Sequence, residues 1–289
     1  MEKEIKDCFD KFNLSLNPFN KESIIYKVNN NKPVEVDYWF KTVFEKAIQA
    51  AQISGGRYDI TCAPFINLWG FGFKEIDSGE DLQHTIDSLK QFVGYGKIYL
   101  DGNKVIKEDP RIQLNASSIA KGYACDVIAE LLESFKVTDY LVAIGGEIHA
   151  KGRNPSGFYW RIEIPRPIDD SEGKKNQGME FLQLRDKSIA TSGNYRNFRI
   201  KDGKKYGHTI NALTGYPAES NILSASVIYD NCMTADAFAT VFMTMDLEEA
   251  VDLGDRLQAD GFDYLFIYAD EKGNLKEKRS ANLDNFLLR

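Results

Sequence analysis

The sequence predicts an α+β fold in which helices interrupt groups of short antiparallel strands. Two patterns in the sequence support this prediction. Apolar residues recur at helical spacing in a few long segments, and the short strand-like segments are often followed by tight turns instead of helices. A regular doubly wound βαβ sheet would alternate strands with helices. The observed order therefore favours layers of largely antiparallel sheet with packed helices.

Helices are expected where apolar residues return every three or four positions. These segments are residues 5–12, 37–54, 119–135, a stretch from Thr234 and a stretch from Asp246. Asp37 and Asp246 are plausible N-caps, and Glu249 would close a capping box with Asp246. Phe135 is expected to face the core.

Strands are expected where short runs are rich in β-branched and aromatic residues. They cover residues 97–100, 140–144, 159–164, 181–184, 223–228 and 264–268. The most polar stretch, residues 169–177 (DDSEGKKNQ), is typical of a surface loop.

Composition excludes several classes of protein. Acidic residues outnumber basic ones, 43 to 36, so the formal net charge is -7, which argues against a groove for nucleic acid. No apolar run approaches the roughly 18 residues that span a bilayer. The start of the chain is charged and helix-patterned and shows no signal peptide. The four cysteines are scattered, without the clustering of a zinc site.

Residues 57–73 (RYDITCAPFINLWGFGF) combine an acidic residue with aromatic residues and two glycines. A strand entering an aromatic turn would explain this segment without any chemistry. No Walker A loop or dinucleotide fingerprint is present, so the usual nucleotide-binding motifs are excluded.

Residues 115–126 (NASSIAKGYACD) place Lys121 at the start of a predicted helix. The N-H groups of a helix N-terminus favour an anion, and a phosphate could bind there beside Lys121. A simple Asn or Ser cap followed by a solvated lysine explains the pattern equally well.

Asp236 and Thr240 are four residues apart in TADAFAT, and so lie on one face of a helix. A carboxylate and a hydroxyl stacked in this way can both bind a hard cation, and magnesium takes few protein ligands. The alternative is structural, with Thr234 as the cap and Asp236 as a favourable first-turn charge.

His208 lies in residues 190–217 (from ATSGNYRNF to YGHTINALTGYP), whereas His84 and His149 have no comparable polar, glycine-rich setting. It is a candidate general base, although a lone histidine is more often a structural hydrogen-bonding group.

Together these segments resemble the FAD:protein FMN transferase family, also called ApbE-like flavin transferases. The motifs follow the family's order from about Leu14 to the C-terminal region. They are SLNPFNKESII, RYDITCAPFINLWGFG, NASSIAKGYACD, YLVAIGGEIHAKGRNPSGFYWRIEIPRP, IATSGNYRNF, GHTINALTGYP and CMTADAFAT.

The resemblance implies a single T-fold-like α+β domain over residues 1–289, with FAD in a cleft between layers and Mg2+ at its pyrophosphate. It assigns roles to the matching positions. Those near FAD are Phe19, Arg57, Tyr58, Asp59, Asn115, Lys121 and Ile210. Those near the metal are Asp236, Thr240, Ala239 and the backbone carbonyl of Ser118, and the candidate base is His208.

The implied reaction moves FMN from FAD to a threonine hydroxyl of an acceptor protein and releases AMP. The family's acceptors are typically subunits of redox complexes outside the cytoplasmic membrane. The resemblance therefore implies a periplasmic or cell-envelope protein, and a lipoprotein whose leader has been trimmed is one form that it allows. Two alternatives stay open. Water in place of threonine would give an FAD pyrophosphatase, and loss of catalysis would leave an FAD-binding protein.

The sequence departs from the family pattern at several positions. Phe19 replaces a tyrosine, Asn115 replaces an aspartate, and INALTG replaces Ile-Asp-Pro-Arg-Thr-Gly. The family's N-terminal strand with a Met-Gly-Thr motif has no counterpart in this sequence. The flavin pocket and the turn after His208 are therefore expected to differ in detail.

Overall fold

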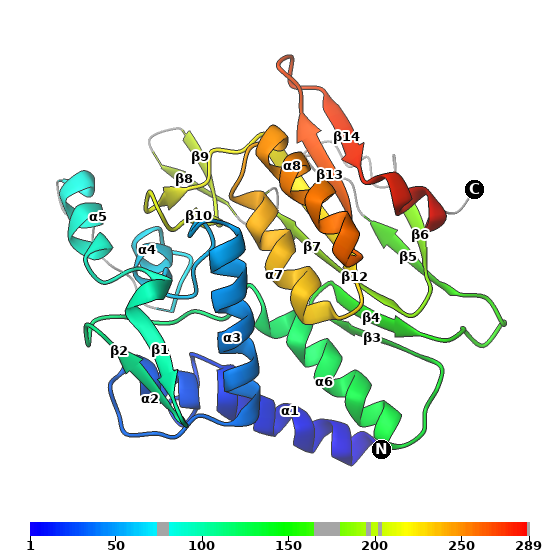
Figure 1. Ribbon diagram of the computed structural model, residues 1–289, viewed down its shortest axis with the longest axis horizontal. Coiled ribbons are helices and arrows are strands. Elements are labelled where there is room, and N and C mark those ends of the chain that lie inside the picture. The colour runs from blue at the N-terminus through cyan, green and yellow to red at the C-terminus, as the bar shows by residue number, and fades with distance from the viewer. Residues whose placement is uncertain (74–80, 165–179, 195–197, 202–203, 288–289) are drawn as a thin grey trace. The chain divides into compact units, whose positions relative to one another are not determined.

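The computed structural model describes residues 1–73, 81–164, 180–194, 198–201 and 204–287 (Figure 1). Two compact units make up the chain: Met1–Ala120 with His208–Ala218, and Lys121–Gly207 with Glu219–Arg289. The predicted surface loop at 169–177 lies outside the described residues. Within the described residues, no helix has the length and apolar character that crossing a membrane requires.

The first unit is mainly helical and carries two small antiparallel hairpins. Its helices are α1 (Glu2–Leu16), α2 (Ile24–Asn29), α3 (Tyr38–Ile53), α4 (Ala63–Leu68), α5 (Leu82–Lys90) and the 3-10 helix η1 (Tyr95–Lys97). Its strands are β1 (Ile98–Asp101), β2 (Lys104–Lys107), β10 (Ile210–Asn211) and β11 (Tyr216–Pro217). The helices predicted near the N-terminus and after Asp37 are confirmed.

Asp37 caps α3, as the sequence predicted. Its carboxylate accepts the N-H of Phe40 at 2.8 Å and also the hydroxyl of Ser15, at the end of α1, at 2.8 Å. One side chain therefore satisfies an orphan N-H of α3 and joins two helices.

The second unit is built on a six-stranded antiparallel sheet with the order β14-β13-β12-β7-β4-β3. These strands are β3 (Tyr140–Ile144), β4 (Glu147–Lys151), β7 (Lys187–Gly193), β12 (Ile222–Tyr229), β13 (Asp263–Ala269) and β14 (Leu275–Arg279). Two hairpins join β5 (Trp160–Ile164) to β6 (Glu180–Leu184) and β8 (Phe198–Lys201) to β9 (Lys204–Gly207). The predicted α+β class is confirmed.

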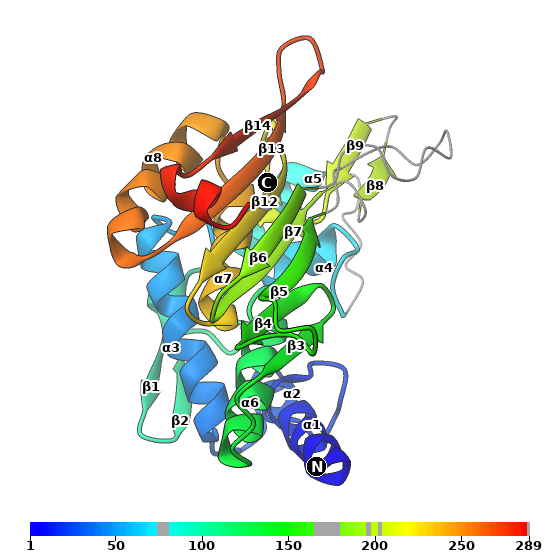
Figure 2. The same ribbon diagram turned by 90° about the vertical axis from the view of Figure 1, so that its right-hand side faces the viewer.

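Helices cover one face of this sheet and the β5–β6 hairpin covers part of the other (Figures 1 and 2). The helices are α6 (Ala120–Ser134), α7 (Cys232–Met243) and α8 (Leu247–Leu257), and short 3-10 turns follow at η3 (Gln258–Asp260) and η4 (Ala281–Asn285). Along β7, Ser192 bonds to Thr240 of α7, whereas Ile189 packs with the hairpin residues Ile162 and Leu182. The alternation of side chains along a strand accounts for the two-sided packing.

The six predicted strands are all present, but two details of the helices were wrong. Phe135 lies beyond the end of α6 and is 46% exposed, because the helix stops at Ser134 before its apolar face reaches that residue. Thr234 is not a cap: α7 begins at Cys232 and Asn231 caps it, with its side chain accepting the N-H of Thr234 at 2.9 Å.

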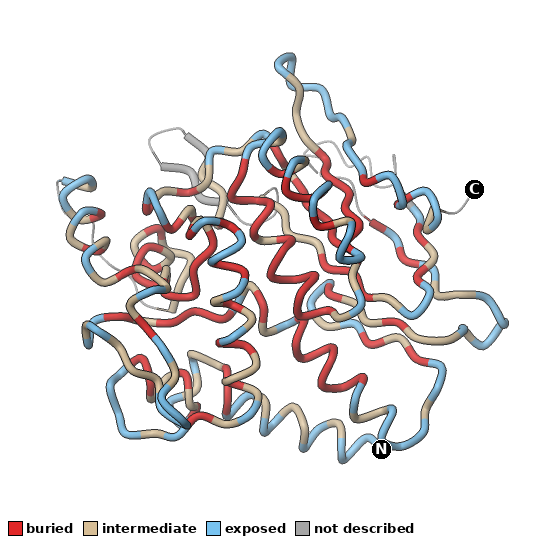
Figure 3. Tube along the Cα trace, in the orientation of Figure 1, coloured by how far each residue is buried: buried red, intermediate tan, exposed pale blue. Residues whose placement is uncertain are grey.

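Helix α7 is the most enclosed element of the second unit, red along almost its whole length in Figure 3. Every one of its residues is buried except Thr240. A helix that is apolar nearly all round belongs inside a core, where it packs on β4, β7 and β12. Burial of a polar side chain on α7 therefore lowers the free energy of unfolding unless the side chain has a partner, so each polar residue of this helix needs a structural or functional reason.

Helices α6 and α7 lie in close contact at Gly122. A Cβ atom at this position would lie 2.3 Å from the carbonyl oxygen of Cys232 and 2.7 Å from the Cβ of Asp236. The Gly122 N-H donates to the carboxylate of Asp236 at 2.9 Å. Only glycine allows this contact, which fixes Asp236 against the first turn of α6.

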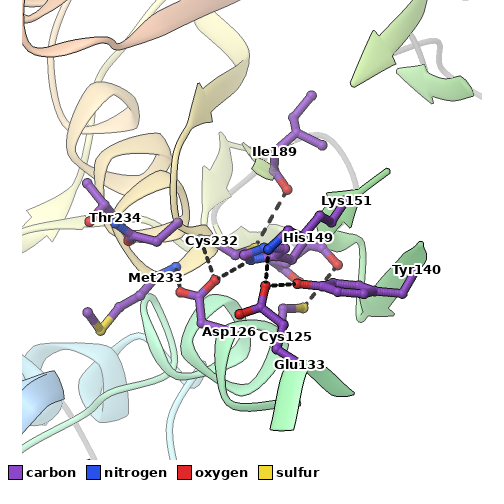
Figure 4. Close-up of polar contacts among 12 residues, drawn as sticks. Cys125, Asp126, Glu133, Tyr140, His149, Lys151, Ile189, Cys232, Met233 and Thr234 are labelled. Carbon is purple, nitrogen blue, oxygen red and sulfur yellow. Dashed lines mark hydrogen bonds and ion pairs between the residues drawn. The ribbon is translucent and has the colours of Figure 1, made fainter. Parts of the chain in front are cut away.

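Asp126, one turn further along α6, holds the N-terminus of α7 (Figure 4). Its two carboxylate oxygens accept the N-H groups of Cys232 and Met233, each at 2.8 Å, and His149 Nδ1 lies 2.8 Å from one of them. The ring of His149 stacks on Tyr140. With Asn231, Asp126 satisfies the first N-H groups of α7 and fixes where that helix begins.

We expect Gly122→Ala to lower the free energy of unfolding by about 2–3 kcal/mol, because two atoms of α7 would have to move. Alanine's better helix propensity recovers only about 1 kcal/mol. Urea denaturation measures the difference. Gly96→Ala is the control, since a Cβ there meets nothing within 4 Å, and it should change stability by less than about 0.5 kcal/mol. Equal effects of the two variants would contradict the close crossing.

We expect Asp126→Ala to lower the free energy of unfolding by about 2–4 kcal/mol, because two backbone N-H groups and a histidine lose a charged acceptor. Glu130→Ala, at an exposed position of the same helix, serves as the control. Thermal and urea denaturation of both variants would test this, and a variant at position 126 as stable as the control would exclude the capping role.

Candidate active site

The first cluster of candidate residues joins Lys121 of α6 to two carboxylates of the second unit. Lys121 Nζ lies 2.5 Å from Glu147 Oε1 and 3.7 Å from Asp236 Oδ1. The side chains of Glu147 and Asp236 are only 5% and 3% exposed, while that of Lys121 is 45% exposed. The partly exposed ammonium group of Lys121 is thus paired with two carboxylates that are buried.

The charges in this cluster do not balance. Burial, with a smaller contribution from Glu147, raises the pKa of Asp236 to about 6 against the opposing effects of Lys121 and the Gly122 N-H. Burial acts to lower the pKa of Lys121, but Asp236 and Glu147 outweigh it and the pKa is raised. The lysine therefore stays protonated. Two carboxylates facing one ammonium leave the cluster ready to accept another cation.

Thr240 extends the cluster by one helical turn, as its spacing from Asp236 predicted. Its hydroxyl lies 3.2 Å from the hydroxyl of Ser192 at the end of β7. Among the described residues no group of three or more His, Cys, Asp or Glu side chains forms a metal site. Magnesium does not need one, because it binds few protein oxygens and completes its shell with phosphate and water. Asp236 and Thr240 fit that chemistry.

The remaining predicted metal positions contribute no side-chain ligand. Ala239 is fully buried and has no donor atom in its side chain. Ser118, in the first unit, precedes α6, and its hydroxyl donates to Tyr58 Oη at 3.1 Å. Its backbone carbonyl as a metal ligand remains a prediction.

The loop before α6 is held by Asn115, which is buried in the first unit. Its N-H donates to the carbonyl of Ile60 at 2.8 Å, and its side-chain oxygen accepts the N-H of Ser117 at 2.8 Å. An aspartate, which the resemblance favours here, could accept the same bond. The replacement therefore keeps this turn of the backbone while removing a charge.

Backbone N-H groups at the start of α6 are less available to an anion than the sequence suggested. The Ala120 N-H donates to the carbonyl of Ala116 at 2.8 Å, and the Gly122 N-H donates to Asp236. The ammonium of Lys121, and not these two N-H groups, is therefore the group at this position that is available to a phosphate.

Asp59, in the segment 57–59, is held by contacts inside the first unit. Its carboxylate accepts the N-H and hydroxyl of Thr61, both at 2.7 Å, and the N-H of Tyr95 at 2.6 Å. Burial raises its pKa, with these hydrogen bonds acting in the opposite direction. Tyr58 is buried beside it, and the carbonyl of Arg57 accepts the N-H of Ala212 at 3.0 Å. The segment is a turn leading to α4, not the strand that could have explained it.

His208 opens a compact turn of the first unit that ends at Ala218. The strands β10 and β11 pair within it, and Trp69 Nε1 donates to the carbonyl of Gly215 at 2.9 Å. Gly215 has φ of 79° and no room for a side chain, because a Cβ would lie 2.8 Å from Ile86. His208 itself is half-buried, with its ring 6.2 Å from that of Phe71 in an edge-on contact, and Ile210 is buried.

Phe19, the predicted flavin-lining residue, is 73% exposed. Its ring lies 6.4 Å from that of Phe73, edge-on. An exposed aromatic side chain beside a second one is the type of surface on which a planar ring system can stack. The structure thus leaves Phe19 accessible to a ligand.

The structure brings Lys121 to 3.7 Å from Asp236 within the second unit, with Thr240 one helical turn further along α7, whereas the sequence offered the two motifs separately. It adds Glu147 and Ser192, which sequence reasoning missed. Both lie in segments quoted for the family resemblance, and Glu147 is a charged residue directly after a glycine pair, at the start of a strand. A carboxylate at such a turn was the signal that could have identified it.

Comparisons with known proteins identify the family of the whole chain. The sequence matches the model of the ApbE family over residues 1–266. A Vibrio cholerae protein named FAD:protein FMN transferase is 32% identical, covering 99% of this chain and 84% of its own length. The Haemophilus influenzae protein of the same name is also 32% identical, over 88% of this chain and 75% of its own.

Solved structures extend the likeness to the fold. The flavin transferase ApbE from Vibrio cholerae aligns with a TM-score of 0.88 at 32% identity, over 99% of this chain and 90% of that chain. The apo flavinyl transferase ApbE from Pseudomonas stutzeri gives 0.84 at 26% identity, over 98% of this chain and 87% of that one. Since the family model spans most of the chain and these relatives share its fold throughout, this protein belongs to the ApbE family and is a transferase.

Proposed function

We propose that this protein transfers FMN from FAD to a threonine hydroxyl of an acceptor protein and releases AMP. The observation that carries the proposal is the cluster of Lys121, Asp236 and Thr240, a cation and a pair of magnesium-type oxygen ligands, in a chain whose relatives are named FAD:protein FMN transferase. Such a cluster suits the pyrophosphate of a dinucleotide, whose negative charge needs both kinds of partner.

In this proposal, the side chains of Asp236 and Thr240 would hold Mg2+, and the family resemblance adds the backbone carbonyl of Ser118 and the position of Ala239 as further metal contacts. The bound ion supplies Lewis-acid stabilisation of phosphate oxygens. Lys121 pairs with the same pyrophosphate and offsets the charge that builds up when its bridging bond breaks. The fixed position of Asp236 against Gly122 means that this carboxylate needs no rearrangement to serve as a ligand.

Residues of the first unit are assigned to the flavin half of FAD and its surroundings. Phe19 offers an exposed aromatic face, Ile210 an apolar contact and Arg57 a positive charge. Tyr58, Asp59 and Asn115 hold the backbone that surrounds these contacts, through the hydrogen bonds described above.

His208 is the proposed general base. A neutral imidazole takes the proton from the threonine hydroxyl as its oxygen forms a bond to the phosphorus on the FMN side. The bond from that phosphorus to the bridging oxygen breaks, and AMP leaves with the bridging oxygen. The product is FMN in phosphoester linkage to the acceptor. We expect this acceptor, a subunit of a redox complex, to lie outside the cytoplasmic membrane.

Incubation of the purified protein with FAD, Mg2+ and an acceptor domain that carries a threonine motif tests the proposal, with intact mass as the measurement. We expect the acceptor to gain one FMN only when Mg2+ is present. Asp236→Ala should abolish the gain, and His208→Ala should slow it by about 10²–10⁴-fold. Release of FMN and AMP with an unmodified acceptor would instead indicate a pyrophosphatase, and unchanged FAD would indicate a binding protein. Full activity of the histidine variant would exclude His208 as the base.

Asp236→Asn should stabilise the metal-free protein at pH 7. The folded-state pKa of Asp236 is raised from 3.8 to about 6, so its ionised form opposes folding. The free energy of unfolding of the wild-type protein therefore falls as the pH rises from about 4 through 6. Asparagine can still accept the Gly122 N-H and carries no charge. We expect a gain on the order of 2 kcal/mol at pH 7 in the presence of a chelator, shrinking at pH 5.

Urea denaturation at the two pH values measures this difference. Addition of Mg2+ should reverse the order at pH 7, because only the wild-type carboxylate binds the ion well. If Asp236→Asn is less stable than wild type in chelator at pH 7, the charge of Asp236 does not lower the free energy of unfolding and this prediction is wrong.

A further inference from the structure

Glu147 is the buried partner of Lys121 that the proposed reaction does not yet use. It is the first residue of β4, directly after the Gly145–Gly146 turn, and its carboxylate accepts a hydrogen bond from Lys121 Nζ at 2.5 Å. The hydrogen bond of Cys125 Sγ to its carbonyl oxygen, at 3.3 Å, joins this end of β4 to α6. The carboxylate therefore comes from a position that both the strand and the helix fix.

The other oxygen of this carboxylate, Oε2, is buried and has no hydrogen-bond partner among the described residues. A buried carboxylate with one unsatisfied oxygen costs stability, because the ion pair does not replace all of its lost hydration. An apolar side chain of similar size would suit a site designed for stability alone. This unfavourable burial indicates a functional role for Glu147, and its ion pair among the described residues is with Lys121.

Lys121 needs such a partner to hold a defined position. A lysine side chain has a long flexible stem, and this one is nearly half exposed. Its stem lies against the glycine turn: a Cβ at Gly145 would be 3.1 Å from Lys121 Cδ and 3.3 Å from Glu147 Oε2. Gly145 has φ of 65°, so glycine suits both its backbone and the space. The turn supports the stem and Glu147 holds its charged end.

Asp236 is a weaker partner for the ammonium, at 3.7 Å, and one of its oxygens already accepts the Gly122 N-H. If Asp236 binds a cation, its negative charge is engaged there, and Glu147 remains as the carboxylate that holds the lysine. The two carboxylates thus have separate roles: Asp236 would bind the cation, and Glu147 pairs with Lys121.

We propose that Glu147 is a positioning residue, which holds the ammonium of Lys121 where it meets the phosphate groups of the dinucleotide substrate. This proposal rests on the proposed function, in which Lys121 pairs with the pyrophosphate of FAD. Glu147 itself does not touch the substrate. It reduces the conformational freedom that Lys121 would otherwise lose on binding.

A double-mutant cycle tests the proposal with Glu147→Gln, Lys121→Met and the two combined. The first measurement is the equilibrium binding of FAD, followed by flavin fluorescence in the presence of a chelator, so it does not depend on catalysis. The second is kcat and KM for FAD in the transfer assay with Mg2+. Circular dichroism and urea denaturation check that each variant folds.

We expect Glu147→Gln to weaken FAD binding about tenfold, the effect of one charged hydrogen bond, and to raise KM more than it lowers kcat. Lys121→Met should weaken binding at least as much. The combined variant should bind like Lys121→Met, since Glu147 acts only through the lysine. Glu133→Gln is the matched control: Glu133 pairs with Lys151 at 2.6 Å on the surface, and its loss should leave FAD binding unchanged.

A Glu147→Gln effect that persists at full size without Lys121 would overturn the proposal, and so would unchanged binding by Glu147→Gln when Lys121→Met binds poorly. Unchanged binding by Lys121→Met would overturn both this proposal and the pyrophosphate role of Lys121, so that failure is recognised separately. A wild-type protein that binds FAD neither in chelator nor with Mg2+ would contradict the proposed function itself.

Discussion

The close crossing of α6 and α7 at Gly122 is the contact on which the candidate site depends. It brings the backbone of one helix within hydrogen-bonding distance of a carboxylate on the other. Lys121 precedes Gly122 and Asp236 contacts it, so the absence of a side chain on Gly122 allows the two charged groups to lie close together. Any larger residue would separate the helices and, with them, the cation from the carboxylate.

A second consequence of this crossing is that polar groups are present inside an otherwise apolar core. Helix α7 is buried at every residue but Thr240, and its carboxylate at Asp236 is incompletely neutralised. Asp126 compensates part of the cost by satisfying the N-H groups at the start of α7. The core thus holds one carboxylate in a fixed position although burial disfavours its charged form. That is useful for binding a cation and unfavourable for stability alone.

Much of the fold could be predicted from the sequence, because its long helices are strongly amphipathic and its central strands are apolar. The predicted segments 140–144 and 264–268 lie in β3 and β13. Strand β14 (LKEKR) escaped prediction because it lies at a sheet edge and is charged on both faces, and β7 because it is rich in Ser, Thr and Gly. The start of α7 was predicted near Thr234 from the apolar spacing, but the cap at Asn231 starts the helix at Cys232.

The site was predictable only in part, for a related reason. Helical spacing placed Asp236 and Thr240 on one face, a local property of the chain. The pairing of Lys121 with Glu147 joins α6 to β4, and no local pattern encodes such a contact. The same holds for the contact of Ser192 with Thr240. Tertiary contacts of this type follow from the sheet order and from the crossing of two helices.

The glycine turn beside Lys121 also limits which cation this site can use. The stem of the side chain lies against Gly145 and its end is bound by Glu147, so a compact ammonium is held on two sides. The planar, forked guanidinium of an arginine is wider and would have to displace either the turn or the carboxylate. The architecture therefore suits a point charge better than a bidentate one, and an anion can approach such a group from more than one direction.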